Sequence, residues 1–337
     1  MNSQTRFLNS CKSKRVDRPP VWLMRQAGRC LPEYRALRER HDFLEMLTRE
    51  ELIAEVSLQP WRRFQMDAVI VFADILLLPM VLGMELQFLE GQGPKFPHLI
   101  SGEKDLGALK KFNAAADIPF LTAALKKIKR ETKDEAALIG FAGSPWTVAS
   151  YVTQDFEELR EKNPALLKKI LGRLTKETIP YLKAQVEAGA DVLQIFDSWG
   201  GILSPSEYAE WSAPYIREIA AALKATGVPI IIYVKESAAL LEEMIATACD
   251  VISVGWETPL AKAKQIAGGK VAIQGNFNPH ILMQATPEEI RLAAKNMIRE
   301  MEDYPGYIAN LGHGVLPKTP VENIEAFTNT IKLTADS

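Results

Sequence analysis

The chain has 337 residues, of which 47% are hydrophobic and 24% are charged, and its net charge is −2. This average balance creates no overall field that attracts nucleic acid or an anionic membrane, so neither is expected as a partner. The longest apolar runs, 68–73 and 75–81, are shorter than the roughly 20 residues of a membrane span, and the N-terminus lacks the apolar core of a signal peptide. We therefore expect a cytoplasmic protein.

Cysteine and histidine are few and dispersed. The three cysteines, Cys11, Cys30 and Cys249, are far apart and form no C-x-x-C pair. This spacing argues against a disulfide framework and against a cysteine-rich zinc site. The four histidines are also scattered and include no H-E-x-x-H motif. No metal site is expected.

Short runs rich in Val, Ile and Leu recur along the chain. Each run is followed by turn residues and then by a helical pattern, which is typical of buried strands rather than of helix segments. Eight strands are predicted in this way, at residues 21–24, 68–72, 138–141, 192–196, 229–234, 251–254, 271–273 and 307–311.

Many of the predicted helices begin at a Ser-Pro or Thr-Pro pair. The hydroxyl can accept a hydrogen bond from the first helical turn, and proline has no N–H to leave unpaired there. Five such pairs begin at Ser144, Ser204, Thr258, Thr286 and Thr319. A glutamate three residues after the cap predicts a capping box at Glu207, Glu289 and Glu322, and at Thr48 with Glu51.

Continuous apolar strands that alternate with amphipathic helices predict a parallel sheet covered by helices. Eight such units are what a (β/α)8 barrel requires. We therefore predict an α/β fold, a TIM barrel, formed by a single domain over residues 1–337. The second unit is the least regular, because 79–102 is rich in glycine and proline and is predicted to be a long loop.

Polar residues follow most of the predicted strands directly. In a (β/α)8 barrel the active site lies at the carboxyl ends of the strands, so these residues are the candidates for a functional site. They are Arg25 and Arg29, Asp74, the segment 143–151 with Tyr151, Asp197 and Ser198, Lys235 and Glu236, Gln274 and Asn276, and His313 between two glycines.

Each candidate also has a structural interpretation. Arg25 and Arg29 could pair with Glu33 or Glu39 on the surface, and Asp74 could cap a turn. However, two guanidinium groups on a glycine-containing turn suit bidentate binding of carboxylates or phosphates. A carboxylate in the apolar run VIVFADILLLP is costly to bury without partners. Packing or turn formation would equally account for Tyr151, Asp197, Ser198 and His313.

Taken together, the motifs resemble those of the uroporphyrinogen decarboxylase family. The first signature of that family is similar to PVWLMRQAGRCLPEYR at 20–35, and the second is similar to GFAGSPWTVASYV at 140–152. The resemblance extends through VFADILLLPMVLGMEL, IFDSWGG, IQGNFNP and NLGHGVLPKTPVEN. It therefore covers nearly the whole chain.

The resemblance implies a (β/α)8 barrel that forms a homodimer and converts uroporphyrinogen III to coproporphyrinogen III. The reaction removes four acetate carboxyl groups and uses no cofactor or metal. The site residues that the resemblance implies are Arg25, Gln26, Ala27, Gly28, Arg29, Asp74, Tyr151, Ser198 and His313.

The chemistry of the substrate explains why such a residue set suffices. Protonation of a pyrrole carbon beside the acetate makes the ring a cationic electron sink, as pyridoxal phosphate or thiamine does elsewhere. We expect Asp74 to accept the pyrrole N–H groups and to stabilise that cation. Arg25 is the proton donor that the resemblance favours. Arginine, tyrosine and histidine side chains would hold the carboxylates of the substrate.

The sequence departs from the family pattern at several places. Cys30 stands where the family has an aromatic residue, and Gly255 stands where aspartate is common. The segment after Tyr151 runs quickly into FEELREK without the usual glycine- and serine-rich loop, and the fifth strand ends in Lys-Glu-Ser rather than Gly-Lys-Gly. These departures predict changes in packing, rate and loop dynamics more than a different reaction.

Two other functions stay open at this point. A corrinoid-protein methyltransferase of the same superfamily would need zinc-ligating cysteine and histidine, and Cys249 stands at the foot of the sixth strand without a His-x-Cys pair. A porphyrin-binding protein without catalysis would fit the departures. Retention of Asp74 and of both arginines argues against it.

Overall fold

The computed structural model of the chain describes residues 1–89 and 93–336. Its centre is a seven-stranded parallel sheet in the order β1-β4-β5-β6-β7-β8-β9. The strands are β1 (Ala68–Ile70), β4 (Ala137–Gly143), β5 (Val192–Asp197), β6 (Ile230–Val234), β7 (Val251–Ser253), β8 (Ala272–Phe277) and β9 (Tyr307–Leu311). The predicted parallel α/β architecture is confirmed, with seven of the eight predicted runs present as strands.

The segment Pro20–Met24, predicted as the first strand, lies between the two edges of this sheet. On the β9 side, the Trp22 N–H donates to the Ala309 carbonyl at 3.4 Å, and the Ala309 N–H donates to the Pro20 carbonyl at 2.9 Å. On the β1 side, the Val21 carbonyl accepts from the Asp67 N–H at 2.9 Å. The segment therefore closes the sheet into a barrel.

The prediction of a regular strand over this segment is wrong, because only Val21 forms a ladder bridge. Two of the next backbone donors are taken by side-chain amides instead. The Leu23 N–H donates to Oε1 of Gln26 at 3.2 Å, and the Met24 N–H donates to Oδ1 of Asn310 at 3.1 Å. These amides replace ladder hydrogen bonds and let the chain turn at the barrel mouth.

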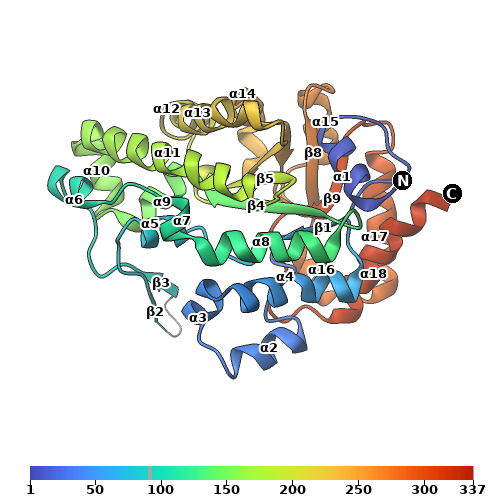
Figure 1. Cartoon of the computed structure of the whole chain (residues 1–337). Coiled ribbons are helices and arrows are strands. Elements are labelled where there is room, and N and C mark those ends of the chain that lie inside the picture. The colour runs from blue at the N-terminus through green and yellow to red at the C-terminus, as the bar shows by residue number, and fades with distance from the viewer. Residues whose placement is uncertain (90–92, 337) are drawn as a thin grey trace.

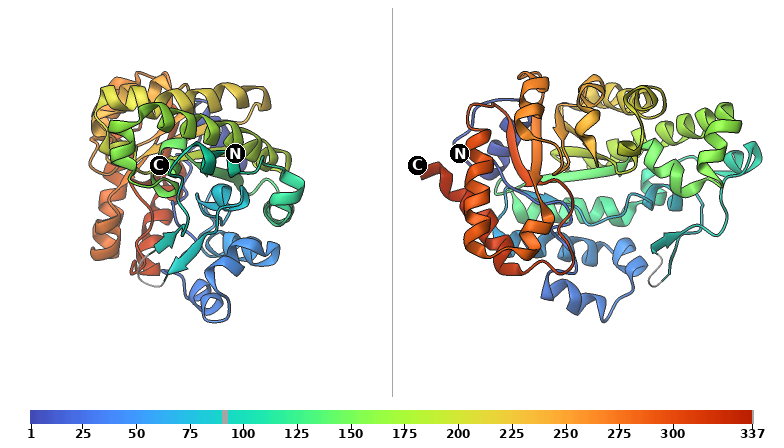
Figure 2. Two further views of the ribbon diagram at one scale, coloured as in Figure 1. Left: turned by 90° about the vertical axis from the view of Figure 1, so that its left-hand side faces the viewer. Right: turned by 180° about the vertical axis from the view of Figure 1, so that it is seen from behind.

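Helices surround the barrel, as Figures 1 and 2 show. In the first half they are α1 (Ser3–Cys11), α2 (Pro32–Arg38), α3 (Phe43–Thr48), α4 (Glu50–Phe64), α5 (Leu77–Val81), α6 (Glu103–Ala108), α7 (Ala114–Asp117), α8 (Pro119–Thr132), α9 (Pro145–Val152) and α10 (Phe156–Lys162). In the second half they are α11 (Pro164–Glu187), α12 (Pro205–Trp211), α13 (Ala213–Leu223), α14 (Leu241–Ala246), α15 (Leu260–Ala267), α16 (Pro279–Gln284), α17 (Pro287–Glu300) and α18 (Val321–Lys332). Short 3-10 turns occupy Gly200–Ile202, Lys224–Thr226, Ser237–Ala239 and Leu333–Asp336. No described helix is long and apolar enough to cross a membrane.

Three of the five predicted Ser-Pro and Thr-Pro caps are confirmed. The Ser144 side chain caps α9, and full capping boxes are present at the starts of α12 and α17. At α15 and α18 the proline itself is the cap residue, so Thr258 and Thr319 make no cap and Glu322 completes no box. The box at Thr48 with Glu51 is also wrong, because Thr48 ends α3 and Arg49 precedes α4.

The long connection after β1 is more ordered than predicted. It contains α5 and an antiparallel hairpin of β2 (Gln87–Leu89) and β3 (Gly93–Lys95). In Figures 1 and 2 this hairpin lies toward the end of the molecule that carries α6 and α10, whereas the two termini lie at the other end.

The fully buried Asp67 anchors the N-terminal segment beneath the barrel. Its Oδ1 pairs with Nη1 of Arg6 at 2.8 Å, and its Oδ2 pairs with Nη1 of Arg18 at 2.7 Å. Oδ2 also accepts the Val21 N–H at 2.8 Å. A buried carboxylate is tolerated when its lone pairs are satisfied in this way.

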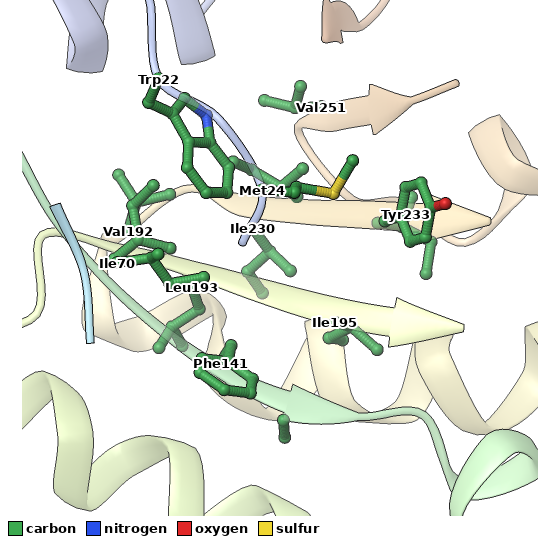
Figure 3. Packing of buried hydrophobic residues seen from close by; sticks show 14 of the residues in the cluster. Trp22, Met24, Ile70, Phe141, Val192, Leu193, Ile195, Ile230, Tyr233 and Val251 are labelled. Atoms are coloured by element: carbon green, nitrogen blue, oxygen red, sulfur yellow. The ribbon is translucent and has the colours of Figure 1, made fainter. Parts of the chain in front are cut away.

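The lower interior of the barrel combines apolar packing with a neutral hydrogen-bonded layer. Figure 3 shows Trp22 and Met24 among apolar side chains of β1, β4, β5 and β6. Trp22 Nε1 donates to Oε1 of Gln274 at 2.8 Å, and Nε2 of Gln274 donates to Oε1 of Gln194 and to Ser253 Oγ. The barrel is therefore filled below its mouth.

Replacement of Asp67 tests this anchor. Asp67→Asn keeps the shape of the side chain but leaves the buried Arg18 guanidinium without its counter-charge and leaves Arg6 with Asp17 alone. We expect the free energy of unfolding to fall by about 3–5 kcal/mol in urea titrations. Glu158→Gln is the control, since it breaks the exposed ion pair with Lys162 and should cost less than about 1 kcal/mol. Equal stabilities of the two variants would contradict the anchoring role.

Candidate active site

A cavity of about 1310 Å³ opens at the carboxyl end of the barrel. Its wall combines the turn that follows Pro20–Met24, the end of β1, the ends of β4, β5 and β6, and the loop after β9. The structure places seven of the nine residues implied by the resemblance in this wall: Arg25, Ala27, Gly28, Arg29, Asp74, Ser198 and His313. Residues far apart in sequence are thus gathered at one site.

The other two implied residues lie outside the wall. The Gln26 side chain is buried, and its Nε2 donates to the Ala68 carbonyl at 3.3 Å while its Oε1 accepts the Leu23 N–H. Gln26 therefore fastens the arginine-bearing turn to β1. Tyr151 lies in the last turn of α9, with its ring 6.5 Å from that of Trp199.

Arg25 is held in an unusual backbone conformation. Its φ angle is 58°, in the left-handed region that non-glycine residues rarely occupy. The aliphatic part of its side chain packs on Gly314, where any Cβ would collide with Cγ and Cδ of Arg25. The glycine after His313 is therefore required for the close approach of the arginine to the histidine loop.

Asp74 is partly open to the cavity but is otherwise enclosed by protein. Its Oδ1 accepts the Leu76 N–H at 2.8 Å. Burial raises the pKa of the Asp74 carboxyl above its usual range, against the opposing effects of this hydrogen bond and of the Arg25 charge. Its remaining acceptor capacity faces the site, so a ligand that brings N–H groups or positive charge would stabilise the ionised form.

His313 is a neutral hydrogen-bond donor in this site. Burial, together with the charges of Arg25 and Lys235 and a smaller contribution from His280, lowers its pKa to about 4. Its Nδ1 accepts the Gly314 N–H, which places the ring proton on Nε2. The imidazole stacks on Trp256 with ring centres 6.0 Å apart.

The inner wall of the cavity is aromatic, and inspection of the sequence missed it. Phe141, Phe196 and Tyr233 come from adjacent strands, with ring centres 5.3 Å and 5.9 Å apart in edge-to-face pairs. The candidates from the sequence were the residues that follow each strand. These three rings lie within the strands, where continuous apolar residues give no signal of which side chains face inward.

The mouth of the cavity is rich in arginine. Arg25, Arg29, Arg38 and Arg40 line it, and none of them forms an ion pair with an acidic residue in the described parts of the chain. The alternative pairing with Glu33 is wrong, because Glu33 binds Nε of Arg63 at 2.9 Å. Arg38 and Arg40 were missed, although they continue the same cationic stretch of sequence.

The remaining strand-end candidates have structural partners. Asp197 is fully buried and accepts hydrogen bonds from Ser144, Thr147 and Ser212, which position the turn that presents Ser198. Three other candidates also bind protein groups. Lys235 forms an ion pair with Glu236, and Asn276 donates hydrogen bonds to the carbonyls of Gly255 and Thr258. Gln274 belongs to the buried layer beneath the site.

Two departures from the family pattern have clear structural settings. Cys30 lines the cavity but is 5% exposed, and burial raises the pKa of its thiol to about 11. The thiol is therefore protonated and unreactive at neutral pH. At Gly255, a Cβ would collide with the carboxylate of Glu257, which occupies that space.

Titration of His313 tests the electrostatics of the site. Because the folded-state pKa of about 4 lies below the value of 6.5 for an unperturbed histidine, folding favours the neutral ring. The resulting stability is present above pH 6.5 and is lost as the pH falls toward 4. An NMR titration of the His313 Cε1 signal, assigned with His313→Gln, should show a midpoint near 4. A midpoint near 6.5 would contradict this environment.

Comparison with known proteins agrees with the geometry. The profile of the family described as "Uroporphyrinogen decarboxylase (URO-D)" matches residues 2–333. The uroporphyrinogen decarboxylase of Cellvibrio japonicus (strain Ueda107) is 41% identical over 97% of this chain and 95% of its own length. That of Pseudoalteromonas translucida (strain TAC 125) is 40% identical over 97% and 96%.

Among solved structures, a methyltransferase from Methanosarcina mazei superposes with a TM-score of 0.85 at 23% identity and covers 99% of both chains, which shows a shared fold. The family match and the relatives at about 40% identity show the family as well as the fold. The chain belongs to the uroporphyrinogen decarboxylase family.

Proposed function

We propose that this protein converts uroporphyrinogen III to coproporphyrinogen III in porphyrin biosynthesis. The observation that carries the proposal is the position of Asp74, a carboxylate at the inner part of a cavity whose mouth carries arginines that form no ion pair among the described residues. A macrocycle with four central N–H groups and eight peripheral carboxylates has the complementary charge pattern. The names of the relatives support the same substrate.

In this proposal Asp74 lies beneath the macrocycle and accepts its pyrrole N–H groups. Protonation of a pyrrole carbon beside the acetate makes the ring cationic, and the fixed carboxylate stabilises that charge as it develops. Burial raises the pKa of the Asp74 carboxyl in the protein itself. Binding of the N–H groups would lower it.

Each decarboxylation then balances without a redox partner. The ring carbon takes one proton, the bond between the acetate methylene and its carboxylate breaks, and the electron pair moves into the cationic ring as CO₂ leaves. A proton adds to the exocyclic methylene, and the ring carbon loses its extra proton. The net change replaces a carboxylate by a hydrogen, leaving a methyl group.

Arginines at the mouth would hold the carboxylates and select the acetate that reacts. Arg29 is exposed at the rim, which suits binding of peripheral carboxylates by charge-assisted hydrogen bonds. Arg25 packs on the His313 loop through Gly314, and we assign to it the role of proton donor. Ala27, Gly28 and Ser198 complete the wall, while Gln26 and Tyr151 act from outside it.

The oligomeric state, the location and the extent of the catalytic domain belong to the same proposal. We propose a homodimer that works in the cytoplasm, with one catalytic domain over residues 1–337. Support for a protein interface comes from Trp199 and Ile202, large apolar side chains that are 41% and 55% exposed on the connection between β5 and α12.

The methyltransferase alternative receives no support from the placement of Cys249. This residue precedes β7 at the amino end of the barrel, away from the cavity, and burial raises the pKa of its thiol. An activity assay distinguishes the proposed enzyme from a porphyrin-binding protein without catalysis.

Anaerobic incubation with uroporphyrinogen III tests the proposed activity. Chromatography should show stepwise loss of four carboxyl groups, through products with seven, six and five carboxyls, to coproporphyrinogen III. Binding without new products would favour the catalytically inactive alternative. Stoichiometric zinc in the purified protein, without these products, would favour the methyltransferase.

Two substitutions test the roles of Asp74 and Arg29. Asp74→Asn should lower kcat by about 10²–10³-fold with little change in KM, because it removes a charge needed mainly in the transition state. Arg29→Ala should raise KM by about 10-fold or more and leave kcat nearly unchanged. Equal effects on both parameters in both variants would contradict the assignment.

A further inference from the structure

Among the described residues, the hydroxyl of Tyr233 makes only one long hydrogen bond. It donates to the Gly312 carbonyl at 3.4 Å, although Tyr233 is only 3% exposed. Two other buried tyrosines, Tyr304 and Tyr307, donate to carbonyls at 2.6 Å each. The usual O–H···O distance is about 2.7–2.8 Å, and a poorly paired buried hydroxyl costs stability.

The position of this hydroxyl connects it to the site. Tyr233 belongs to the cavity wall, and Figure 3 shows its hydroxyl pointing along β6 toward the carboxyl end of the barrel. Its ring centre lies 5.9 Å from that of Phe196 and 6.4 Å from that of His313. A phenylalanine would make the same ring contacts, so packing does not explain the hydroxyl.

The phenol is a neutral donor at every pH at which the enzyme would work. Burial is the main reason that its pKa is raised, and the charges of Glu257 and Glu236 raise it further against the opposing charge of Arg25. His313 beside it is also neutral and presents its Nε2–H. Two uncharged donors therefore lie within reach of the Arg25 charge.

We propose that the Tyr233 hydroxyl is a substrate-binding group. It donates a hydrogen bond to a carboxylate on the pyrrole ring of the macrocycle that is held over Asp74. This substrate carboxylate would give the hydroxyl a close acceptor, whereas the Gly312 carbonyl accepts only at 3.4 Å. Together with His313 and Arg25, it would fix the orientation of the ring whose acetate reacts. This inference rests on the proposed function and adds a specificity-determining residue to it.

Tyr233→Phe is the direct test, and Tyr304→Phe is the matched control. Loss of a hydrogen bond to a charged group is worth about 1.5–3 kcal/mol, so kcat/KM for uroporphyrinogen III should fall by roughly 10–100-fold. Intermediates with fewer carboxyls should accumulate, because each depends more on the contacts that remain. Tyr304→Phe breaks a shorter hydrogen bond outside the cavity and should leave kcat/KM within about twofold.

Two further measurements separate binding from a structural role. The His313 Cε1 chemical shift should be unchanged in Tyr233→Phe, which would show that the histidine loop keeps its place. Equilibrium binding of coproporphyrinogen III, kept reduced, should weaken by at least about fivefold. Unchanged kcat/KM and unchanged affinity in Tyr233→Phe would overturn the inference. If the wild-type protein shows no turnover, the proposed function fails, and the affinity comparison still decides the role of Tyr233.

Discussion

The site depends on the insertion of residues 20–24 between β9 and β1. Backbone hydrogen bonds to Ala309 and Asp67 hold this segment in the place of a strand, and the buried Asp67 carboxylate fastens it from below with Arg6 and Arg18. The turn that follows must then emerge at the mouth of the barrel. A constraint at one end of the barrel thus determines where the cationic turn lies at the other.

Positive and negative charges lie at different depths in the cavity. Cationic side chains gather at the mouth without acidic partners among the described residues, whereas the inner wall consists of aromatic rings with neutral donors and the enclosed carboxylate of Asp74. Such an arrangement suits the binding of peripheral carboxylates at the mouth and of a developing positive charge inside. The proposed decarboxylation would use this pattern, because the ring that becomes cationic must meet a fixed negative charge while its substituents stay held.

Periodicity and turn chemistry predicted the parallel barrel and most strand positions, because apolar runs of strand length leave few other folds. They could not predict that the Met24 N–H donates to Asn310, which is 286 residues away in the sequence, or that the Gln26 side chain folds back to accept the nearby Leu23 N–H. Short motifs identified the residues after each strand as candidates. The inward-facing Tyr233 escaped notice because, in a continuous apolar strand, nothing local distinguishes the side chains that face the cavity.

In the proposed complex, Asp74 binds the pyrrole N–H groups while the arginines bind peripheral carboxylates. A crystal structure of the protein with coproporphyrinogen III, prepared without oxygen, tests it most directly. We expect pyrrole nitrogens within about 3.2 Å of the Asp74 carboxylate oxygens, with propionate groups on Arg29 and its neighbours. A macrocycle bound with a propionate facing Asp74, or bound outside the cavity, would contradict it.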